Sequence, residues 1–263
     1  MPEKQIILPI STAKELMDFA HAVNQFHNDQ QRDLIVTLTK DIDLRGKEWA
    51  PIGNEDIPFY GTFNGAGHTI RGLFISKKTA GCYGLFGALA GTVENLTVSG
   101  MITCALGDPY SAEGGIAGLM IGGHIKSCTS TLTIESNGKN IGLFVGGIAG
   151  RVENGTIQNC HSSVMFQNVG GSFLYLGGVV GSAADSQINS CVYDGPIHIL
   201  DGADENFSLG GIAGSLEGQS DVICCTHNGI ADGQWQDTDF PAVGDIIRQV
   251  DTGKKHIPQM EHC

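Results

Sequence analysis

The stretch GGIAGRVENGTIQNC, from Gly146 to Cys160, decides the fold because it recurs along the chain. Related stretches begin at Gly114, Gly177 and Gly210, so the first glycines are 32, 31 and 33 residues apart. A degenerate earlier copy, YGLFGALAGTVENL, begins at Tyr83. Self-similarity at a fixed period of this size predicts a solenoid in which each copy forms one turn.

Alignment of the copies places residues of the same kind in columns. Three columns are small to medium apolar and rich in β-branched residues, which is typical of strands whose inward side chains stack between turns. A polar column precedes one of them and predicts a hydrogen-bonded bend, because Asn and Ser bond the local backbone. The apolar columns are Val93, Ile125, Ile157, Ile188 and Val222; Leu96, Cys128, Cys160, Cys191 and Cys225; and Ile102, Ile134, Phe166, Ile197 and Ala231, and the polar column is Asn95, Ser127, Asn159, Ser190 and then Cys224.

Each copy holds three short strand-like pieces, GGIAG, GTIQNC and SSVMF in the quoted one, which predicts one turn of a right-handed parallel β-helix. The cysteine column is then a buried apolar stack of free thiols. Parallel side-chain vectors do not suit disulfide geometry, and buried cysteine behaves as a small hydrophobe. No CxxC pair occurs, so we expect no zinc knuckle and no other metal site.

Both ends of a solenoid expose strand edges that need a cover. Residues 11–26 predict a capping α-helix with a capping box at Thr12 and Glu15. We divide the chain into an N-terminal segment with this helix (residues 1–33), β-helix repeats (34–231) and a C-terminal cap (232–263). A short helix is expected in the last part, near Val243 to Val250.

The composition narrows the classes of function. Lys and Arg number 15 against 28 Asp and Glu, a net charge of −13, so ordinary nucleic-acid binding is disfavoured. No apolar run is long enough to span a membrane, and no apolar signal core is visible at the start. Phosphate loops, dinucleotide fingerprints, nucleophile elbows and HExxH are absent, so no cofactor is expected.

The order STAKELMDFAHAVN, LTKDIDLRGKEWAPIGN, PFYGTFNGAGHTIRGLFI and YGLFGALAGTVENLTVSG, followed by the GGIAG units, resembles bacterial GLUG-repeat proteins. The resemblance covers about residues 10–230. It implies a β-helix that serves as a stalk or binding module on a secreted or surface-attached protein. Because the chain shows no export signal, a cytoplasmic location is the alternative.

The leading functional hypothesis is a non-catalytic scaffold or binding module that recognises a glycan or a protein through exposed loops. Aromatic residues recur before the glycine pairs and could stack on sugar rings, although packing under loops is the simpler interpretation of them. The candidate ligand-binding residues are Tyr110, Glu113, Tyr175 and Asp108. The sequence does not indicate an oligomeric state.

Two alternatives belong to other classes. A carbohydrate-active enzyme (polysaccharide lyase, glycoside hydrolase or fructan transferase) would place carboxylates about 5 to 9.5 Å apart on adjacent turns. Its candidate catalytic residues lie mainly in the atypical turn CVYDGPIHILDGADENF, and the simpler interpretation is solvated loop carboxylates. An acidic decoy that binds a basic partner is the second alternative. The catalytic candidates are Asp194, His198, Asp201, Asp204 and Glu205, with Asp108 and Glu113 as further carboxylates.

Overall fold

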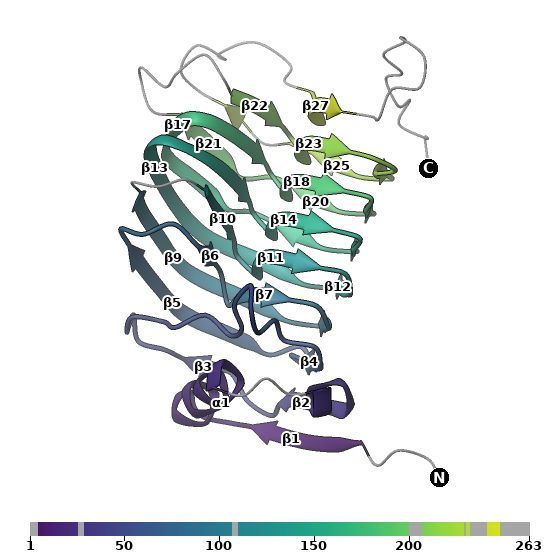
Figure 1. The fold of residues 1–263 in the computed structure, drawn as a ribbon. Helices are drawn as coiled ribbons and strands as arrows, with labels where there is room; N and C mark the ends of the chain where they lie inside the picture. The colour runs from purple at the N-terminus through teal and green to yellow at the C-terminus, as the bar shows by residue number, and fades with distance from the viewer. Residues whose placement is uncertain are drawn as a thin grey trace.

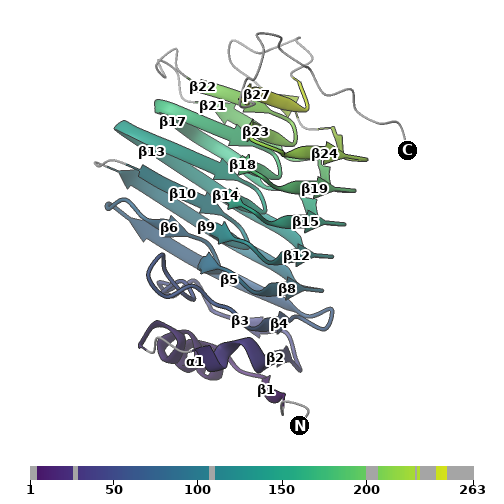
Figure 2. The ribbon, with the colours of Figure 1, turned by 45° about the vertical axis from the view of Figure 1, so that its right-hand side comes forward.

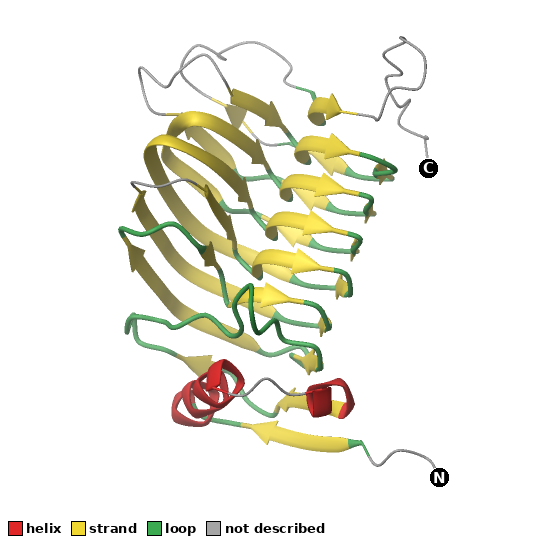
Figure 3. Ribbon diagram, in the orientation of Figure 1, coloured by secondary structure: helices red, strands yellow, loops and turns green. Residues whose placement is uncertain are grey.

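The computed structural model is a parallel β-solenoid with one N-terminal α-helix, as the period predicts (Figure 1). It describes residues 5–25, 29–106, 110–199, 207–228, 230–231 and 241–247. The strands stack into three parallel ladders along the axis, with the helix at the N-terminal end (Figure 3). None of the helices in these ranges is long and apolar enough to cross a membrane.

The first ladder, sheet A, has eight strands that are mostly three residues long (Figure 2). Its inward column is the predicted series Val93, Ile125, Ile157, Ile188 and Val222, paired in register. The strands are, in order, β1 (Ile6–Ile10), β2 (Leu34–Leu38), β4 (Thr62–Asn64), β8 (Thr92–Glu94), β12 (His124–Lys126), β15 (Thr156–Gln158), β19 (Gln187–Asn189) and β24 (Asp221–Ile223).

Sheet B, with 13 strands, curves around the solenoid from the polar bend to the glycine pair. The predicted column from Ile102 to Ala231 pairs in register within it. Its strands are β3 (Ile42–Asp43), β5 (Thr69–Lys77), β6 (Cys82–Tyr83), β9 (Thr97–Leu106), β10 (Tyr110–Gly114), β13 (Thr129–Gly146), β16 (His161–Ser162), β17 (Met165–Gly177), β20 (Val192–Tyr193), β21 (Pro196–Ile199), β22 (Phe207–Gly210), β25 (Thr226–His227) and β26 (Ile230–Ala231).

Sheet C follows the glycine pairs and has six strands. The first glycine of each pair ends a strand of sheet B, the second lies in the turn, and the strand of sheet C begins two residues after the pair. The last strand, β27, corrects the short helix expected near Val243 to Val250: residues 243–247 pair with β23 as a parallel strand. The strands are β7 (Phe86–Leu89), β11 (Ala117–Ile121), β14 (Ala149–Glu153), β18 (Val180–Ala184), β23 (Ala213–Glu217) and β27 (Val243–Ile247).

The polar column forms a left-handed bend between sheets A and B. All five residues have positive φ angles: 53° at Asn95, 54° at Ser127, 54° at Asn159, 51° at Ser190 and 52° at Cys224. Asn tolerates this conformation better than most residues. The backbone N–H of Ser127 donates to the Gln158 carbonyl at 3.0 Å, and the N–H groups of Asn95, Asn159 and Ser190 make the equivalent bond to the next turn. The expected ladder exists, and its rungs are backbone hydrogen bonds.

The cysteine column is buried directly behind this bend. Cys128, Cys160, Cys191 and Cys225 are free thiols with at most 6% of their surface exposed. The Cys160 Sγ atom lies 3.3 Å from the Gln158 carbonyl oxygen and accepts the Cys128 N–H at 3.5 Å. The thiols therefore pack the core and satisfy backbone groups, as a structural column should.

The glycine pairs bring two walls of the solenoid together. A Cβ atom on Gly147, the second glycine of its pair, would overlap the Ser162 side chain and the Gly178 carbonyl oxygen. Ser162 belongs to β16 on the opposite wall. The equivalent glycines of the other copies face the same column of side chains on that wall. These contacts pair Gly115 with Ser130, Gly178 with Tyr193, and Gly211 with His227.

The N-terminal end of the solenoid is covered by α1 (Ala13–Gln25). A short 3-10 helix, η1 (Asp29–Asp33), follows α1 along the chain. The predicted capping box is confirmed: Thr12 N–H donates to Glu15 Oε2 at 3.1 Å, and Glu15 N–H donates to Thr12 Oγ1 at 3.2 Å. The Phe19 ring meets Phe59 and Phe63 at centroid distances of 5.7 and 6.3 Å. The helix thus covers the aromatic end of the core.

Strand β1 remains at the edge of sheet A, and Pro9 faces that edge. The Ile10 carbonyl accepts the Thr39 N–H at 2.9 Å, so the backbone polar groups of Ile10 point toward β2. Because these directions alternate along a strand, the Pro9 nitrogen points away from β2, where no partner needs a donor. Ile6 and Ile7 nevertheless leave 53% and 67% of their surface exposed. Because proline has no N–H group to donate, it lowers the tendency of this exposed edge to pair with another chain.

We predict that Gly147→Ala lowers the free energy of unfolding by about 2–4 kcal/mol, because the added methyl group meets rigid neighbours. Gly142→Ala is the matched control, since its Cβ atom would have Phe144 Cε2 at 4.0 Å as its nearest neighbour. Chemical denaturation of both variants tests this. Equal stability losses in the two would contradict the contact between the walls.

A second expectation concerns the edge. Pro9→Val restores an N–H on the open side of β1 and should increase self-association, measured by light scattering at increasing protein concentration. Adding Ile7→Lys to this variant should return it to the behaviour of the original chain. Unchanged scattering of Pro9→Val would show that the proline does not guard this edge.

Candidate functional site

Side chains outside the structural columns gather where sheet B meets sheet C. The glycine that follows each pair makes this corner tight: a Cβ atom on Gly150 would overlap the Glu113 nitrogen of the preceding turn. The outer faces of the two strands therefore meet at backbone contact. We call the residues that fill this place the aromatic corner; they are Tyr110, Phe144, Tyr175 and Arg151.

Phe144 is the centre of the aromatic corner. Its ring is stacked on Tyr175 with a centroid distance of 5.2 Å and an interplanar angle of 7°, and Tyr110 meets it edge-on at 5.5 Å. Parallel pairing of β13 with β17 places Phe144 directly beside Tyr175. Tyr110 lies opposite Gly142, two residues before Phe144. Both tyrosines remain partly exposed, whereas Phe144 is 9% exposed.

Charged groups border the aromatic rings. The Arg151 guanidinium carbon lies 5.0 Å from the Phe144 centroid, and its Nε atom is 2.8 Å from Glu153 Oε1. On the other side, the Cys82 thiol donates to Glu55 Oε1 at 3.2 Å. Burial raises the pKa of the Tyr110 phenol and, with Glu55, that of the Cys82 thiol, so both stay protonated donors at neutral pH. The corner thus offers hydroxyl and guanidinium donors beside carboxylate acceptors.

Two of the predicted ligand residues, Tyr110 and Tyr175, are therefore brought together through Phe144. Glu113 is not at the surface: its side chain is 0% exposed, so direct contact with a ligand does not fit its position. It accepts hydrogen bonds from Ser136 Oγ at 2.9 Å and from Ser111 Oγ at 3.4 Å, and its Oε2 atom has no partner among the described residues. The fourth candidate, Asp108, lies outside the described residues.

Of the catalytic candidates, only Asp194 and His198 lie in described parts of the chain. Asp194 Oδ2 lies 2.9 Å from His161 Nε2 on the outer face of sheet B, and both side chains are 42% exposed. His198 is partly buried in β21. Asp201, Asp204 and Glu205 lie outside the described residues. Across the described ranges, no three His, Cys, Asp or Glu residues converge in a way that could hold a metal ion.

Sequence reasoning missed Arg151 and the burial of Glu113. A signal for the burial existed, because Glu113 directly precedes a glycine pair where the other copies have Val145, Leu176 and Leu209. These residues pair in register with one another and with Glu113. Alignment of the strand before the glycines would have placed the glutamate in an inward column.

Comparisons with known proteins support the fold and add little about activity. No family model matches the chain. A "Putative Gly-rich membrane protein" of Evansella cellulosilytica is 37% identical over 76 residues, 28% of this chain and 9% of that protein. Halomucin of Haloquadratum walsbyi is 36% identical over 104 residues, 38% of this chain and 1% of that protein. The chain therefore matches less than a tenth of either relative's length.

A solved structure shares the architecture. It is a crystal structure of a "putative immunoglobulin A1 protease" from Bacteroides ovatus, with a TM-score of 0.51 and 18% sequence identity. The match covers 94% of this chain and 84% of that one. At this level of identity the likeness concerns the fold alone, which places the chain among parallel β-solenoids.

Buried Glu113 makes stability depend on pH. Burial raises the pKa of its carboxyl group to about 7, whereas the unfolded chain has the ordinary value near 4.5. The neutral form is therefore favoured by folding, and its contribution is complete below about pH 4.5 and lost as pH rises through 7. The difference corresponds to about 3 kcal/mol.

Glu113→Gln should remove this pH dependence. We expect the free energy of unfolding of the original chain to fall, relative to the variant, by about 3 kcal/mol between pH 4.5 and 7.5. Denaturant titrations of both proteins at constant ionic strength measure the difference, in which contributions from other groups cancel. Parallel curves for the two proteins would show that Glu113 does not titrate in this range.

Proposed function

We propose that the chain is a non-catalytic β-solenoid module that binds a glycan at the aromatic corner. The observation that carries the proposal is that the outward side chains at this corner differ from one turn to the next. The outward column Ala112, Phe144, Tyr175 and Ser208 changes in size and polarity at each turn, while the inward column from Val93 to Val222 holds only valine and isoleucine. Side chains that no structural column requires are free to serve recognition.

The chemistry of the corner suits a polyhydroxylated ligand. Tyrosine combines an apolar face with a hydroxyl, and arginine offers a planar set of donors. Because Tyr175 and Arg151 both pack on the Phe144 ring and leave it 9% exposed, Phe144 would support its neighbours without contacting the ligand. Tyr110 and Tyr175 would contact the sugar, while Arg151, Glu153 and Glu55 would bond its hydroxyl groups.

The proposal includes a role at a bacterial cell surface. It is supported by the resemblance to GLUG-repeat proteins and by the similarity to the "Putative Gly-rich membrane protein" of Evansella cellulosilytica.

The purified chain should bind a subset of the glycans on an array. Calorimetry with the glycan that binds best should then show a loss of affinity in two variants, of different size. Arg151→Gln should weaken binding about tenfold or more, since a charged donor is removed. Tyr175→Ala should weaken it about two- to tenfold, because a ring contact is lost.

Tyr60→Ala is the matched control for these variants. Tyr60 also packs against an arginine, with Arg32 4.7 Å from its ring centroid, but it lies in the loop before β4. Its replacement should leave glycan affinity unchanged. Absence of binding on the array, or equal affinity in all three variants, would refute glycan recognition by the corner.

A further inference from the structure

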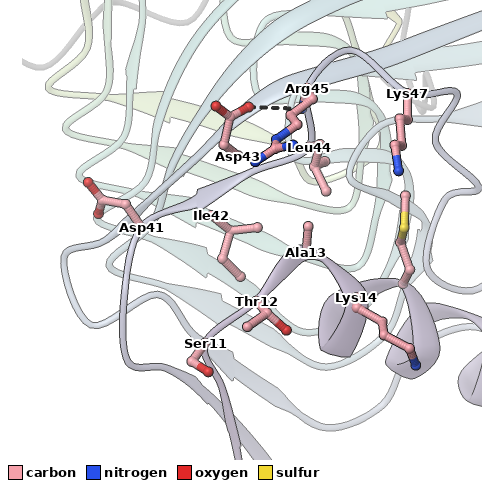
Figure 4. A pocket seen from close by; sticks show the side chains of 11 residues that line it. Ser11, Thr12, Ala13, Lys14, Asp41, Ile42, Asp43, Leu44, Arg45 and Lys47 are labelled. Carbon is pink, nitrogen blue, oxygen red and sulfur yellow. Dashed lines mark hydrogen bonds between the residues drawn. The ribbon is translucent and has the colours of Figure 1, made fainter.

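A second location with the character of a binding site lies at the N-terminal end, between the first turn of α1 and the segment around β3. It is a pocket of about 590 Å³, within the range of roughly 300–1,000 Å³ typical of small-molecule sites. Figure 4 shows Ser11, Thr12 and Lys14 on one side of it and Arg45 and Lys47 on the other. We call it the N-terminal pocket.

The acidic groups at the N-terminal pocket are already engaged. Asp43 Oδ1 accepts the Arg45 N–H at 2.8 Å, and Asp43 Oδ2 lies 3.7 Å from Arg71 Nε. Asp41 Oδ1 accepts the Thr69 N–H at 3.1 Å and lies 3.2 Å from His68 Nδ1. These bonds lower the pKa of the Asp41 carboxyl group, with the Thr69 N–H as the largest cause. Neither carboxylate therefore needs a cation from solution.

The start of the helix is occupied as well. Glu15 Oε2 accepts the N–H groups of Ser11 and Thr12 at 2.7 and 3.1 Å. Lys14 pairs with Asp18 at 2.5 Å. An anion at the pocket would thus find the N–H groups of Ser11 and Thr12 and the Lys14 side chain already paired, and the helix terminus is not the basis of the site.

Two cations remain. Within the described ranges, the side chains of Arg45 and Lys47 form no ion pair, although the chain as a whole carries a net charge of −13. Lys47 extends toward the helix in Figure 4. The floor between them includes Ile42 and Leu44, which are each 1% exposed. The pocket therefore combines two unpaired positive charges with an apolar floor.

We propose that the N-terminal pocket binds a small organic monoanion, a carboxylate held by Arg45 and Lys47. Arginine and a carboxylate match in planar geometry, and lysine adds a point charge. A dianion such as phosphate suits the pocket less well, because Asp41 and Asp43 stand close by and would repel its second charge. The carbon skeleton of the ligand would lie against the partly buried Ala13 and Met17, which also line the pocket, with Ile42 and Leu44 behind them.

Calorimetric or NMR titration of the whole chain tests this with three probes: sodium glucuronate, glucose and inorganic phosphate. We expect saturable glucuronate binding that is at least about fivefold tighter than that of the other two. Arg45→Gln and Lys47→Gln should each weaken it about fivefold or more. Lys78→Gln, which removes an exposed lysine outside the pocket, is the matched control and should bind normally.

Each other outcome overturns the assignment. Tighter binding of phosphate would reject the monoanion, equal binding of glucose would reject charge recognition, and no binding would reject the site. The substitutions are at exposed positions, so circular dichroism should confirm that the fold is retained. Tyr175→Ala should leave glucuronate binding intact, which separates this site from the aromatic corner.

Discussion

The approach of two walls at the second glycine of each pair constrains the rest of the structure. Where Gly147 meets Ser162, there is no volume for a side chain at the glycine, and in other turns the opposite wall fills the same place with the larger Tyr193 and His227. The second glycines therefore let the side chains of the opposite wall reach the backbone of the turn, and the apolar columns fill the space on either side of this contact. The strand before the glycines, the tight outer corner and the position of the aromatic residues all follow from this contact.

The same constraint relates the core to the proposed recognition surface. Because the outer faces of sheets B and C meet at backbone distance near Gly150, long side chains from both sheets must share one corner. Phe144 and Arg151 are then neighbours although they belong to different sheets. Rigid strands position these groups, so little ordering is needed when a ligand binds.

Periodicity in the sequence predicts the inward columns, because a repeated turn makes equivalent residues lie in register. It predicts less well where local and tertiary signals disagree. Val243, Ile246, Ile247 and Val250 have helical spacing, yet residues 243–247 pair with β23, since the open edge of sheet C offers backbone partners. Arg45 and Lys47 belong to no repeated column, so periodicity does not predict that they share a pocket. The pocket exists because α1 packs against the first turn.

Because the left-handed bend recurs once in each turn, the solenoid can gain or lose length in units of one turn. Each bend is closed by hydrogen bonds to the next turn, and the same conformation recurs at Asn95, Ser127, Asn159 and Ser190. A duplicated or deleted turn would present the same columns and the same bend to its new neighbours. Gene rearrangement can therefore lengthen or shorten the solenoid in whole turns, moving the outward residues of one turn relative to those of another without rebuilding the core.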